Sequence, residues 1–269
     1  MATIDMPILK DREFILFQKM IYDRAGINMS DAKKALVSGR LTKRVKHYGL
    51  SSFEDYFNFI TTSANGELQM AVDLLTTNET FFFREPKHFD FLRNSVLPGW
   101  HTGPRRVWSA ASSSGEEAYT LAMLIAEHSP TSAWEIVGTD ISTRVLEKAR
   151  TGHYPIERAE KIPRNYLVKY CLKGIGQQEG TFIMERSLRD RVNFMHANLK
   201  EDLSSLGRFD VIFLRNVMIY FDMATKREVV ARILPQLKPG GHFIVSHSES
   251  LNGISDQLKL ITPSIYCKK

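Results

Sequence analysis

Hydrophobic residues recur at intervals of three and four from residue 12 to about residue 75, which is the periodicity of amphipathic helices. The clearest stretches are "FILFQKMIYDRAGI", "KKALVSGRLTKRVKHYGL" and "FEDYFNFITT", with glycines at the turns. This pattern predicts an all-helical N-terminal domain at residues 1–75. Residues 76–103 follow as a linker, in which a helix runs into the polar "TTNET" and Pro86 starts another helix.

Beyond residue 104 the pattern changes to short apolar runs that alternate with helical stretches. We expect strands at "RRVWSA", "WEIVGTD", "RVNFMHA" and "FDVIFLRN", and helices at 115–128, 142–150 and 224–237. This alternation predicts a parallel sheet with crossover helices. After a fifth strand, "GGHFIVSHS", the closely spaced "LKLI" and "SIYCK" favour an antiparallel hairpin at the edge of the sheet.

About forty residues separate the helix at 142–150 from the third strand, which is too long for a simple loop. They include "KGIGQQEGTFIMERS", which is rich in turn residues and strand-like, so we expect a small β-subdomain inserted at about 153–191. The predicted fold class is therefore α/β. A Rossmann-like sheet domain at 104–269 carries the terminal hairpin and the insertion, and the helical domain precedes it.

Composition adds little to this picture except in its charge and its cysteines. The 269 residues include 43% hydrophobic and 25% charged residues, which is ordinary for a globular protein. No apolar stretch of about 18 residues occurs, and Cys171 and Cys267 stand outside any metal-ligand spacing. We expect a cytoplasmic protein without membrane insertion and without a metal site. The net charge of +6 favours an acidic partner.

The stretch "VWSAASSSGEEAY" at 107–119 contains the first candidate chemistry. Small residues between a strand and a helix let a ligand approach the backbone, which suggests phosphate binding. Glu116 and Glu117 in the first helical turn would repel phosphate, and the G-x-G-x-x-G and G-x-x-x-x-G-K-[ST] motifs are absent. Acidic residues there also offset the helix dipole, which is the simpler explanation. The loop favours a ligand with cationic groups.

In an open parallel sheet, ligands bind at the carboxyl ends of the strands. The second strand ends at Asp140, about two dozen residues beyond the loop, where a carboxylate could accept both hydroxyls of a ribose. Asp140 could instead cap the next helix, and Ser142 is an equal candidate for that cap. A ribose acid, a carboxylate-bearing helix, an amide after the third strand and a terminal hairpin together point to S-adenosylmethionine. The fourth strand ends in "RNVMIYF" rather than [DN]-P-P-[YF], which disfavours methylation of a base nitrogen.

From about residue 14 onward the chain resembles the CheR-type chemotaxis methyltransferases. The resemblance is carried, in order, by "LTTNETFFFRE", "WSAASSSGEEAYTLAM", "GTDIS", "FDVIFLRNVMIYFD" and "LKPGGHFIVSHSESL". It implies methyl esterification of glutamate side chains on the cytoplasmic helices of chemoreceptors, with S-adenosylmethionine as cofactor. In some members the small β-subdomain also holds a peptide from the receptor C-terminus. Here the insertion could equally be a structural cover.

The resemblance also implies roles for single residues. Asp140 becomes the ribose acid, and Glu117 a ligand at or near the methionine end. Arg84 and Tyr220 are the catalytic candidates, Arg84 for orienting a carboxylate and Tyr220 for shaping the sulfonium side. The other implied cofactor-site residues are Asn78, Thr80, Arg84, Asn198, Leu199, Arg215 and Asn216. Caps for Asn78 and Thr80, and core packing for Tyr220, are the alternatives. The phenylalanines at 81–83 are expected to pack rather than to stack on adenine.

The predicted helix "GRLTKRVKHYG" carries a second candidate surface. Its apolar stripe, Val37, Leu41, Val45 and Tyr48, is expected in the core. An adjoining basic stripe is either a solvated face or a docking surface for a glutamate-rich receptor helix; its members are Arg40, Lys43, Arg44 and His47.

Two other functions compete with glutamate methylation. A nucleic-acid methyltransferase is compatible with the net charge, but no RNA-binding signature accompanies it. A non-catalytic receptor adaptor would not need Asp140, Glu117, Arg84 and Tyr220 together. Glutamate methylation itself needs no general base, because a carboxyl with a pKa near 4.3 is already ionised at neutral pH.

Overall fold

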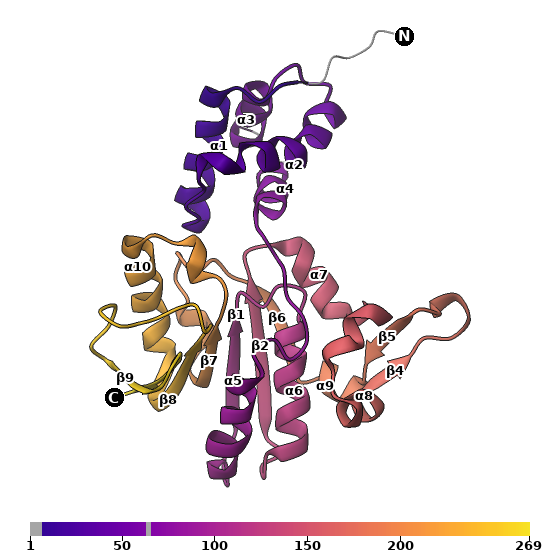
Figure 1. Cartoon of the computed structure of the whole chain (residues 1–269), viewed down its shortest axis with the longest axis vertical. Helices are drawn as coiled ribbons and strands as arrows, with labels where there is room; N and C mark the ends of the chain where they lie inside the picture. The colour runs from indigo at the N-terminus through magenta and orange to yellow at the C-terminus, as the bar shows by residue number, and fades with distance from the viewer. Residues whose placement is uncertain (1–6, 63–65) are drawn as a thin grey trace. The chain divides into compact units, whose positions relative to one another are not determined.

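The computed structural model describes residues 7–62 and 66–269 (Figure 1). The chain forms two compact units, one comprising residues up to 77 together with 220–225, the other comprising 78–219 and 226–269. The first unit is helical, as the three- and four-residue periodicity predicts. Its helices are α1 (Asp11–Ala25), η1 (Asp31–Lys33), α2 (Lys34–His47), α3 (Phe53–Thr62) and α4 (Glu67–Leu75).

Apolar residues one helical turn apart build the core of this unit. Val37, Leu41 and Val45 of α2 are all fully buried, as their spacing predicts. Tyr48 follows the end of α2 and is half-buried. Glu13 of α1 is also buried, because its carboxylate accepts hydrogen bonds from the backbone N–H groups of Lys10 (2.7 Å) and Glu54 (3.1 Å).

The second unit is built on a seven-stranded sheet with the strand order β6-β2-β1-β7-β8-β10-β9. The first five strands in this order pair in parallel, and β10 pairs antiparallel with both β8 and β9, which confirms the predicted terminal hairpin. The strands are β1 (Arg105–Ala110), β2 (Trp134–Asp140), β6 (Val192–His196), β7 (Phe209–Leu214), β8 (Leu237–Val245), β9 (Leu258–Thr262) and β10 (Ile265–Lys268).

Two of the three predicted crossover helices match the structure within a residue at each end. Helix α6 is Glu116–His128 and α7 is Thr143–Thr151. The third, α10, is Met223–Ile233 and ends four residues before the predicted boundary. The chain continues as a 3-10 turn, η8 (Leu234–Gln236), because Pro235 lacks the N–H that an α-helix would need, and β8 then begins at Leu237.

Residues 78–103, expected as a linker, contribute to the core of the sheet unit. They contain α5 (Pro86–Phe91), the π-turn η2 (Leu92–Val96) and the 3-10 turn η3 (Leu97–Gly99). Phe89, Leu92 and Leu97 pack in the same cluster as the buried side of α6. Figure 1 shows α5 and α6 in front of strands β1 and β2.

The predicted insertion forms a separate three-stranded antiparallel sheet in the order β3-β5-β4. Phe82 packs against it, with ring centroids 5.1 Å from Tyr154 and 6.0 Å from Phe182, so it is a packing residue. The elements are β3 (His153–Pro155), η4 (Ile156–Lys161), α8 (Arg164–Tyr170), β4 (Cys171–Lys173), η5 (Gly176–Gln178), β5 (Thr181–Met184) and α9 (Arg186–Arg189). The remaining short turns of the chain are η6 (Ser204–Leu206) and η7 (Met218–Tyr220).

Candidate functional site

The carboxyl ends of β2, β1, β7 and β8 lie side by side, because their registers align Ala110 with Thr139 and with Leu214, and Leu214 with Val245. The loops that follow these strands therefore meet at one edge of the sheet. This arrangement brings together residues from four distant parts of the sequence, as the strand-end rule predicts.

The loop after β1, residues 111–115, turns through three left-handed backbone positions. Ala111, Ser113 and Gly115 have φ values of 59°, 49° and 94°. A Cβ at Gly115 would lie 3.0 Å from side-chain atoms of Ala149, Phe194 and Tyr154, so the loop packs closely against the unit at this point. The hydroxyl of Ser112 in this loop is buried and has no hydrogen-bond partner.

Asp140 ends β2 and is only 6% exposed. Its Oδ2 accepts a hydrogen bond from Ser113 N–H and its Oδ1 accepts one from Ser142 N–H, both at 2.9 Å. The N-cap position of α7 itself belongs to Ser142, whose side chain makes no capping hydrogen bond. Asp140 thus ties the first loop to the second, and a carboxylate has about four acceptor positions in all.

Arg215, at the end of β7, is the centre of an ion network. Its Nη1 donates to Glu117 Oε2 at 2.8 Å, and its Nη2 lies 3.3 Å from Glu85 Oε2 and donates to the backbone carbonyl of Arg84. The side chain is only 2% exposed and lies over the ring of Phe89. Glu117 also accepts a hydrogen bond from Ser109 Oγ at 2.7 Å. Glu117 and Arg215, both predicted at the site, are therefore direct partners.

Asn216 follows with a φ of 59°, an unusual conformation for a residue other than glycine. Two carboxylates that the sequence analysis missed hold it. Glu249 accepts the backbone N–H groups of Asn216 (3.1 Å), Ile219 (3.2 Å) and Ser246 (2.9 Å). Glu85 accepts from the Asn216 side-chain amide at 3.2 Å. The motif "SHSES" carries Glu249, but its role depends on contacts with a strand end more than thirty residues away.

The two carboxylates differ in their electrostatics. Burial raises the pKa of Glu249 despite its three backbone donors. Burial also opposes ionisation of Glu85, but the charge of Arg215 and hydrogen bonds from His247 and Asn216 outweigh it and lower the pKa of Glu85. Glu116, beside Glu117, is 1% exposed, and burial raises its pKa even though Ser114 and Arg158 contact it. The two adjacent first-turn carboxylates of α6 thus have different surroundings.

The linker residues predicted at the site are attached mainly through their backbones. The carbonyl of Asn78 accepts from Ser113 Oγ at 2.8 Å, and that of Thr80 accepts from Arg158 Nη1 at 2.7 Å. Arg84 is half-buried, donates to the Glu79 carbonyl at 3.0 Å and lies over the ring of Phe81.

Two further predicted residues follow β6, whose last residue, His196, is paired with Asp140 at the end of β2, and a third lies in the other unit. Asn198 and Leu199 follow β6, both are 8% exposed, and the Asn198 amide donates to Glu201 Oε1 at 3.1 Å. Tyr220 ends the short helix η7 and belongs to the same compact unit as the N-terminal helices, where its carbonyl accepts from Asn28 N–H at 2.8 Å.

Two of the four residues of the predicted docking stripe on α2 also have partners within their own unit. Arg44 forms a two-point ion pair with Glu67, a carboxylate that is only 4% exposed, with N–O distances of 2.7 and 2.6 Å. Arg40 donates to the carbonyls of Leu75 and Thr76 at the end of α4. Lys43 and His47 are exposed, as is the neighbouring Lys46. Periodicity placed the stripe correctly but could not reveal Glu67, 23 residues away.

The strand-end residues fit S-adenosylmethionine on the chemistry of their side chains. Asp140 offers acceptors to ribose hydroxyls, Glu117 offers negative charge to an ammonium group, and the buried Ser112 hydroxyl faces no partner. A Cβ at Gly138 would lie 2.6 Å from the ring of Phe194, so β2 and β6 approach closely beside this edge.

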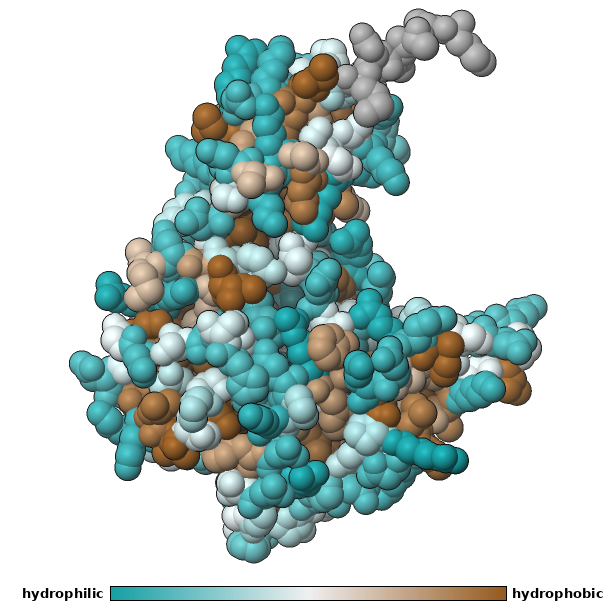
Figure 2. Space-filling view, in the orientation of Figure 1, coloured by the Kyte–Doolittle hydropathy of each residue, from teal (hydrophilic) through white to brown (hydrophobic). Residues whose placement is uncertain are grey.

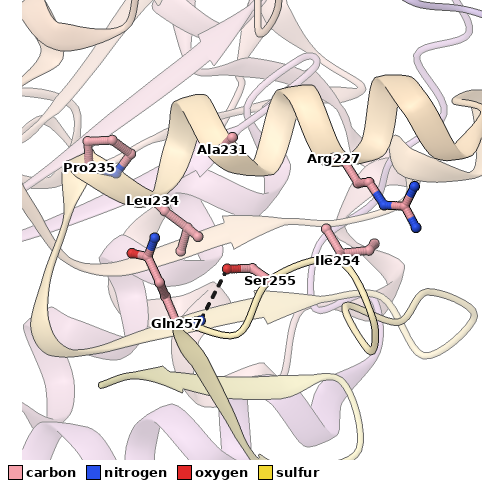
Figure 3. A pocket seen from close by; sticks show the side chains of 7 residues that line it. All are labelled: Arg227, Ala231, Leu234, Pro235, Ile254, Ser255 and Gln257. Atoms are coloured by element: carbon pink, nitrogen blue, oxygen red, sulfur yellow. Dashed lines mark hydrogen bonds between the residues drawn. The ribbon is translucent and has the colours of Figure 1, made fainter.

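A separate hollow of about 160 Å³ lies between α10 and the segment before β9 (Figure 3). Figure 3 shows the side chains of Leu234 and Ile254 on its apolar lining, and Ser255 Oγ accepts a hydrogen bond from Gln257 N–H there. Its volume is below the roughly 300 Å³ of typical small-molecule pockets, and none of the predicted site residues lines it. We assign it no role. Among the described residues, no helix is both long enough and apolar enough to cross a bilayer.

Comparisons with known proteins agree with the resemblance. The family profile described as "CheR methyltransferase, all-alpha domain" matches residues 12–76, and "CheR methyltransferase, SAM binding domain" matches residues 78–267. The chemotaxis protein methyltransferase of Escherichia coli is 38% identical over 96% of this chain and 91% of its own length. That of Borreliella burgdorferi is 37% identical over 99% and 97%. Chemotaxis protein methyltransferase 2 of Pseudomonas aeruginosa is 38% identical over 94% and 92%.

Proposed function

The chain belongs to the CheR methyltransferase family and is an S-adenosylmethionine-dependent methyltransferase, and we propose that it methylates glutamate side chains of chemoreceptors for sensory adaptation. The observation that carries the proposal is the pair of carboxylates Asp140, at the end of β2, and Glu117, in the first turn of the helix that follows the adjacent strand β1. The loop between β1 and this helix has no phosphate-binding motif. Such a site suits a ligand that carries ribose hydroxyls and positive charge and no phosphate.

In this proposal Asp140 accepts hydrogen bonds from the ribose hydroxyls while Ser113 and Ser142 N–H groups hold it in place. Glu117 attracts the ammonium group, and Arg215 fixes the direction of the Glu117 carboxylate. Asn78, Thr80, Asn198, Leu199 and Asn216 complete the cofactor site. Glu249 is a positioning residue, because it fixes the backbone that leads from Arg215 to Ile219.

S-adenosylmethionine supplies a methyl group on a sulfonium and leaves as S-adenosylhomocysteine. The attacking group is a substrate carboxylate that is ionised at neutral pH, so the protein needs to orient it rather than to deprotonate it. Arg84 is the candidate for this orientation, because its side chain is half-buried and can offer paired N–H donors. Tyr220 is the second catalytic candidate, for the sulfonium side.

For the receptor we propose that the basic stripe of α2, Arg40, Lys43, Arg44 and His47, contacts a glutamate-rich helix. Its exposed members are Lys43 and His47, and Lys46, which the sequence analysis did not include, extends this exposed group. Surface charges of this kind mainly accelerate association, and salt screens them. Arg40 and Arg44 also hold α2 to α4.

A receptor C-terminal peptide is a proposed second contact, at the small sheet. Strand β4 is an edge strand of the order β3-β5-β4, and an edge can accept a peptide by main-chain pairing. Beside it Leu172, Ile175 and Val168 are 55%, 83% and 77% exposed. Figure 2 shows hydrophobic patches among hydrophilic residues over the lobe that Figure 1 labels β4 and β5. Because cytoplasmic receptor helices are the proposed substrate, we also propose a cytoplasmic location for the protein.

The test is to incubate the full chain with methyl-labelled cofactor and either a receptor cytoplasmic fragment or nucleic acid. The proposal expects label on the receptor fragment as an ester that mild base releases. Base-stable label on nucleic acid would favour the nucleic-acid methyltransferase instead. Absence of any transferred label, with the receptor fragment bound, would favour a non-catalytic adaptor.

A further inference from the structure

Glu85, His88 and His247 form a cluster that the proposed methyl transfer does not use. One potential ligand atom from each lies within 4.8 Å of the other two. Glu85 and His88 have an E-x-x-H spacing at the start of α5, while His247 comes from the loop after β8. The two imidazole rings have centroids 4.3 Å apart.

The hydrogen bonds of Ser264 determine which nitrogen of His88 carries a proton. The Ser264 hydroxyl has one hydrogen, and it donates that hydrogen to the carbonyl of Pro263. Its oxygen then accepts from His88 Nε2, 2.7 Å away, and lies 3.4 Å from His247 Nδ1, so Nε2 of His88 is protonated and its Nδ1 carries a lone pair. His88 is 1% exposed and Nδ1 has no hydrogen-bond partner.

This lone pair lies 3.4 Å from Glu85 Oε2, so two acceptors face each other in a buried place. Such an arrangement is unfavourable unless a cation lies between them. The unpartnered Nδ1 of His88 beside the carboxylate of Glu85 is a ligand pair for a metal ion.

We propose that Glu85, His88 and His247 form a binding site for a divalent transition metal of the Zn²⁺ type. Two imidazoles and one carboxylate are a common donor set for Zn²⁺, whereas Mg²⁺ and Ca²⁺ prefer oxygen ligands only. Ser264 acts as the outer partner of His88, since it fixes the imidazole tautomer as carboxylates and carbonyls do behind other metal-bound histidines.

The site is coupled to the ion network of Arg215. Glu85 Oε2 also accepts from His247 N–H at 3.1 Å and lies 3.3 Å from Arg215 Nη2. A metal ion on Glu85 therefore competes with Arg215 for this oxygen, and Arg215 keeps its bond to Glu117. Metal binding thus acts on the residues that hold Asn216.

The test is a titration of the untagged full chain with Zn²⁺ against a fluorescent zinc indicator, without cofactor or receptor. We expect one Zn²⁺ per chain. His247→Ala removes an exposed ligand, so the fold should survive and the affinity should fall at least tenfold. Ser264→Ala should weaken binding by about 10- to 100-fold, the usual range for outer partners. His101→Ala, an exposed histidine outside the cluster, is the matched control and should bind as the wild type does.

Three results would overturn the proposal. They are the absence of bound Zn²⁺ in the indicator titration, binding by His247→Ala as tight as by the wild type, and displacement of Zn²⁺ by equal concentrations of Mg²⁺. Because the titration contains neither cofactor nor receptor, these results say nothing about methyl transfer, and a failure of the proposed function would leave them unchanged.

Discussion

The charged residues of α2 and those at the carboxyl ends of the parallel strands differ in the partners that they have within the protein. On α2, Arg44 neutralises the buried carboxylate of Glu67, and Arg40 donates to a carbonyl at the end of α4. The exposed basic residues of this helix are Lys43, Lys46 and His47. At the sheet edge, Asp140 and Glu117 also have protein partners, but these partners are backbone N–H groups, Ser109 and Arg215, which orient the carboxylates. On α2 the internal contacts neutralise or bind two of the basic side chains, whereas at the sheet edge they orient the carboxylates.

This difference shows which kind of sequence pattern is sufficient to predict a functional site. Parallel strand ends coincide in space for any sequence that forms the sheet, so the residues that follow them can be collected without knowledge of their partners. Helical periodicity predicts only which side of the helix a residue faces. The residues that pack against that side determine whether a cation binds a partner protein or stabilises the core. Four sets of substitutions, ordered by expected effect, test the difference.

The largest effect is expected for Arg215→Ala. The change leaves Glu85 and Glu117 without their shared counter-ion in a buried place, which should reduce the free energy of unfolding by about 3–5 kcal/mol. Urea denaturation measures it. Arg232→Ala is the control, because Arg232 pairs with Glu228 on an exposed helix face and should matter by about 0.5 kcal/mol at most. Equal losses in the two variants would contradict the central role of Arg215.

Arg44→Ala should come next, with a loss of about 3 kcal/mol in the free energy of unfolding. Glu67 is 4% exposed and would keep the hydroxyls of Tyr48 and Tyr56 as partners but lose its counter-ion. Lys43→Ala, one position earlier and exposed, should change stability by less than about 0.5 kcal/mol. If both variants unfold like the wild type in urea, Arg44 has no role in stability, and docking would be its remaining role.

Lys43→Glu and His47→Glu should leave stability unchanged and slow methylation of a receptor fragment. We expect about a two- to fivefold slower rate for each, the size of a surface ion pair of up to about 1 kcal/mol. The rates of wild type and variants should converge as salt is added, because screening removes the attraction. Cofactor affinity, measured by calorimetry, should not change. A slower rate that persists at high salt would point to a structural effect.

The smallest expected effect is a difference in stability between variants of the neighbouring residues Glu116 and Glu117. Burial raises the pKa of Glu116, so the folded state favours its neutral form, and the stability that this group contributes falls as pH rises through its folded-state pKa. Glu116→Gln should therefore stabilise the protein by about 0.5–1 kcal/mol at pH 7. The gain should vanish below the ordinary glutamate pKa of 4.5, where the group is protonated in both the folded and the unfolded state. Glu117→Gln weakens the Arg215 pair and should destabilise at pH 7. Denaturation at several pH values distinguishes the two.

Much of this architecture could be predicted from the sequence, because strand alternation, the terminal hairpin and the helix starts depend on local pattern. The end of α10 could not, since the helical periodicity continued past Pro235. Glu249 and Glu85 escaped prediction because Asn216, which both contact, lies 33 and 131 residues away from them in the sequence. The cluster of Glu85, His88 and His247 escaped for the same reason.

The most direct test of the strand-end site is a calorimetric titration of S-adenosylmethionine into the wild type, Asp140→Asn and the control Asp202→Asn. Asp202 is exposed and bonds only to nearby Ser204 among the contacts described. Asp140→Asn removes the charge that would accept ribose hydroxyls, and hydrogen bonds to charged groups contribute about 1.5–3 kcal/mol. We predict an affinity about 10- to 100-fold lower for Asp140→Asn and unchanged for Asp202→Asn. An Asp140→Asn protein that binds the cofactor as tightly as the wild type, with only a lower melting temperature, would show that Asp140 is a structural residue and that the cofactor site is wrongly placed.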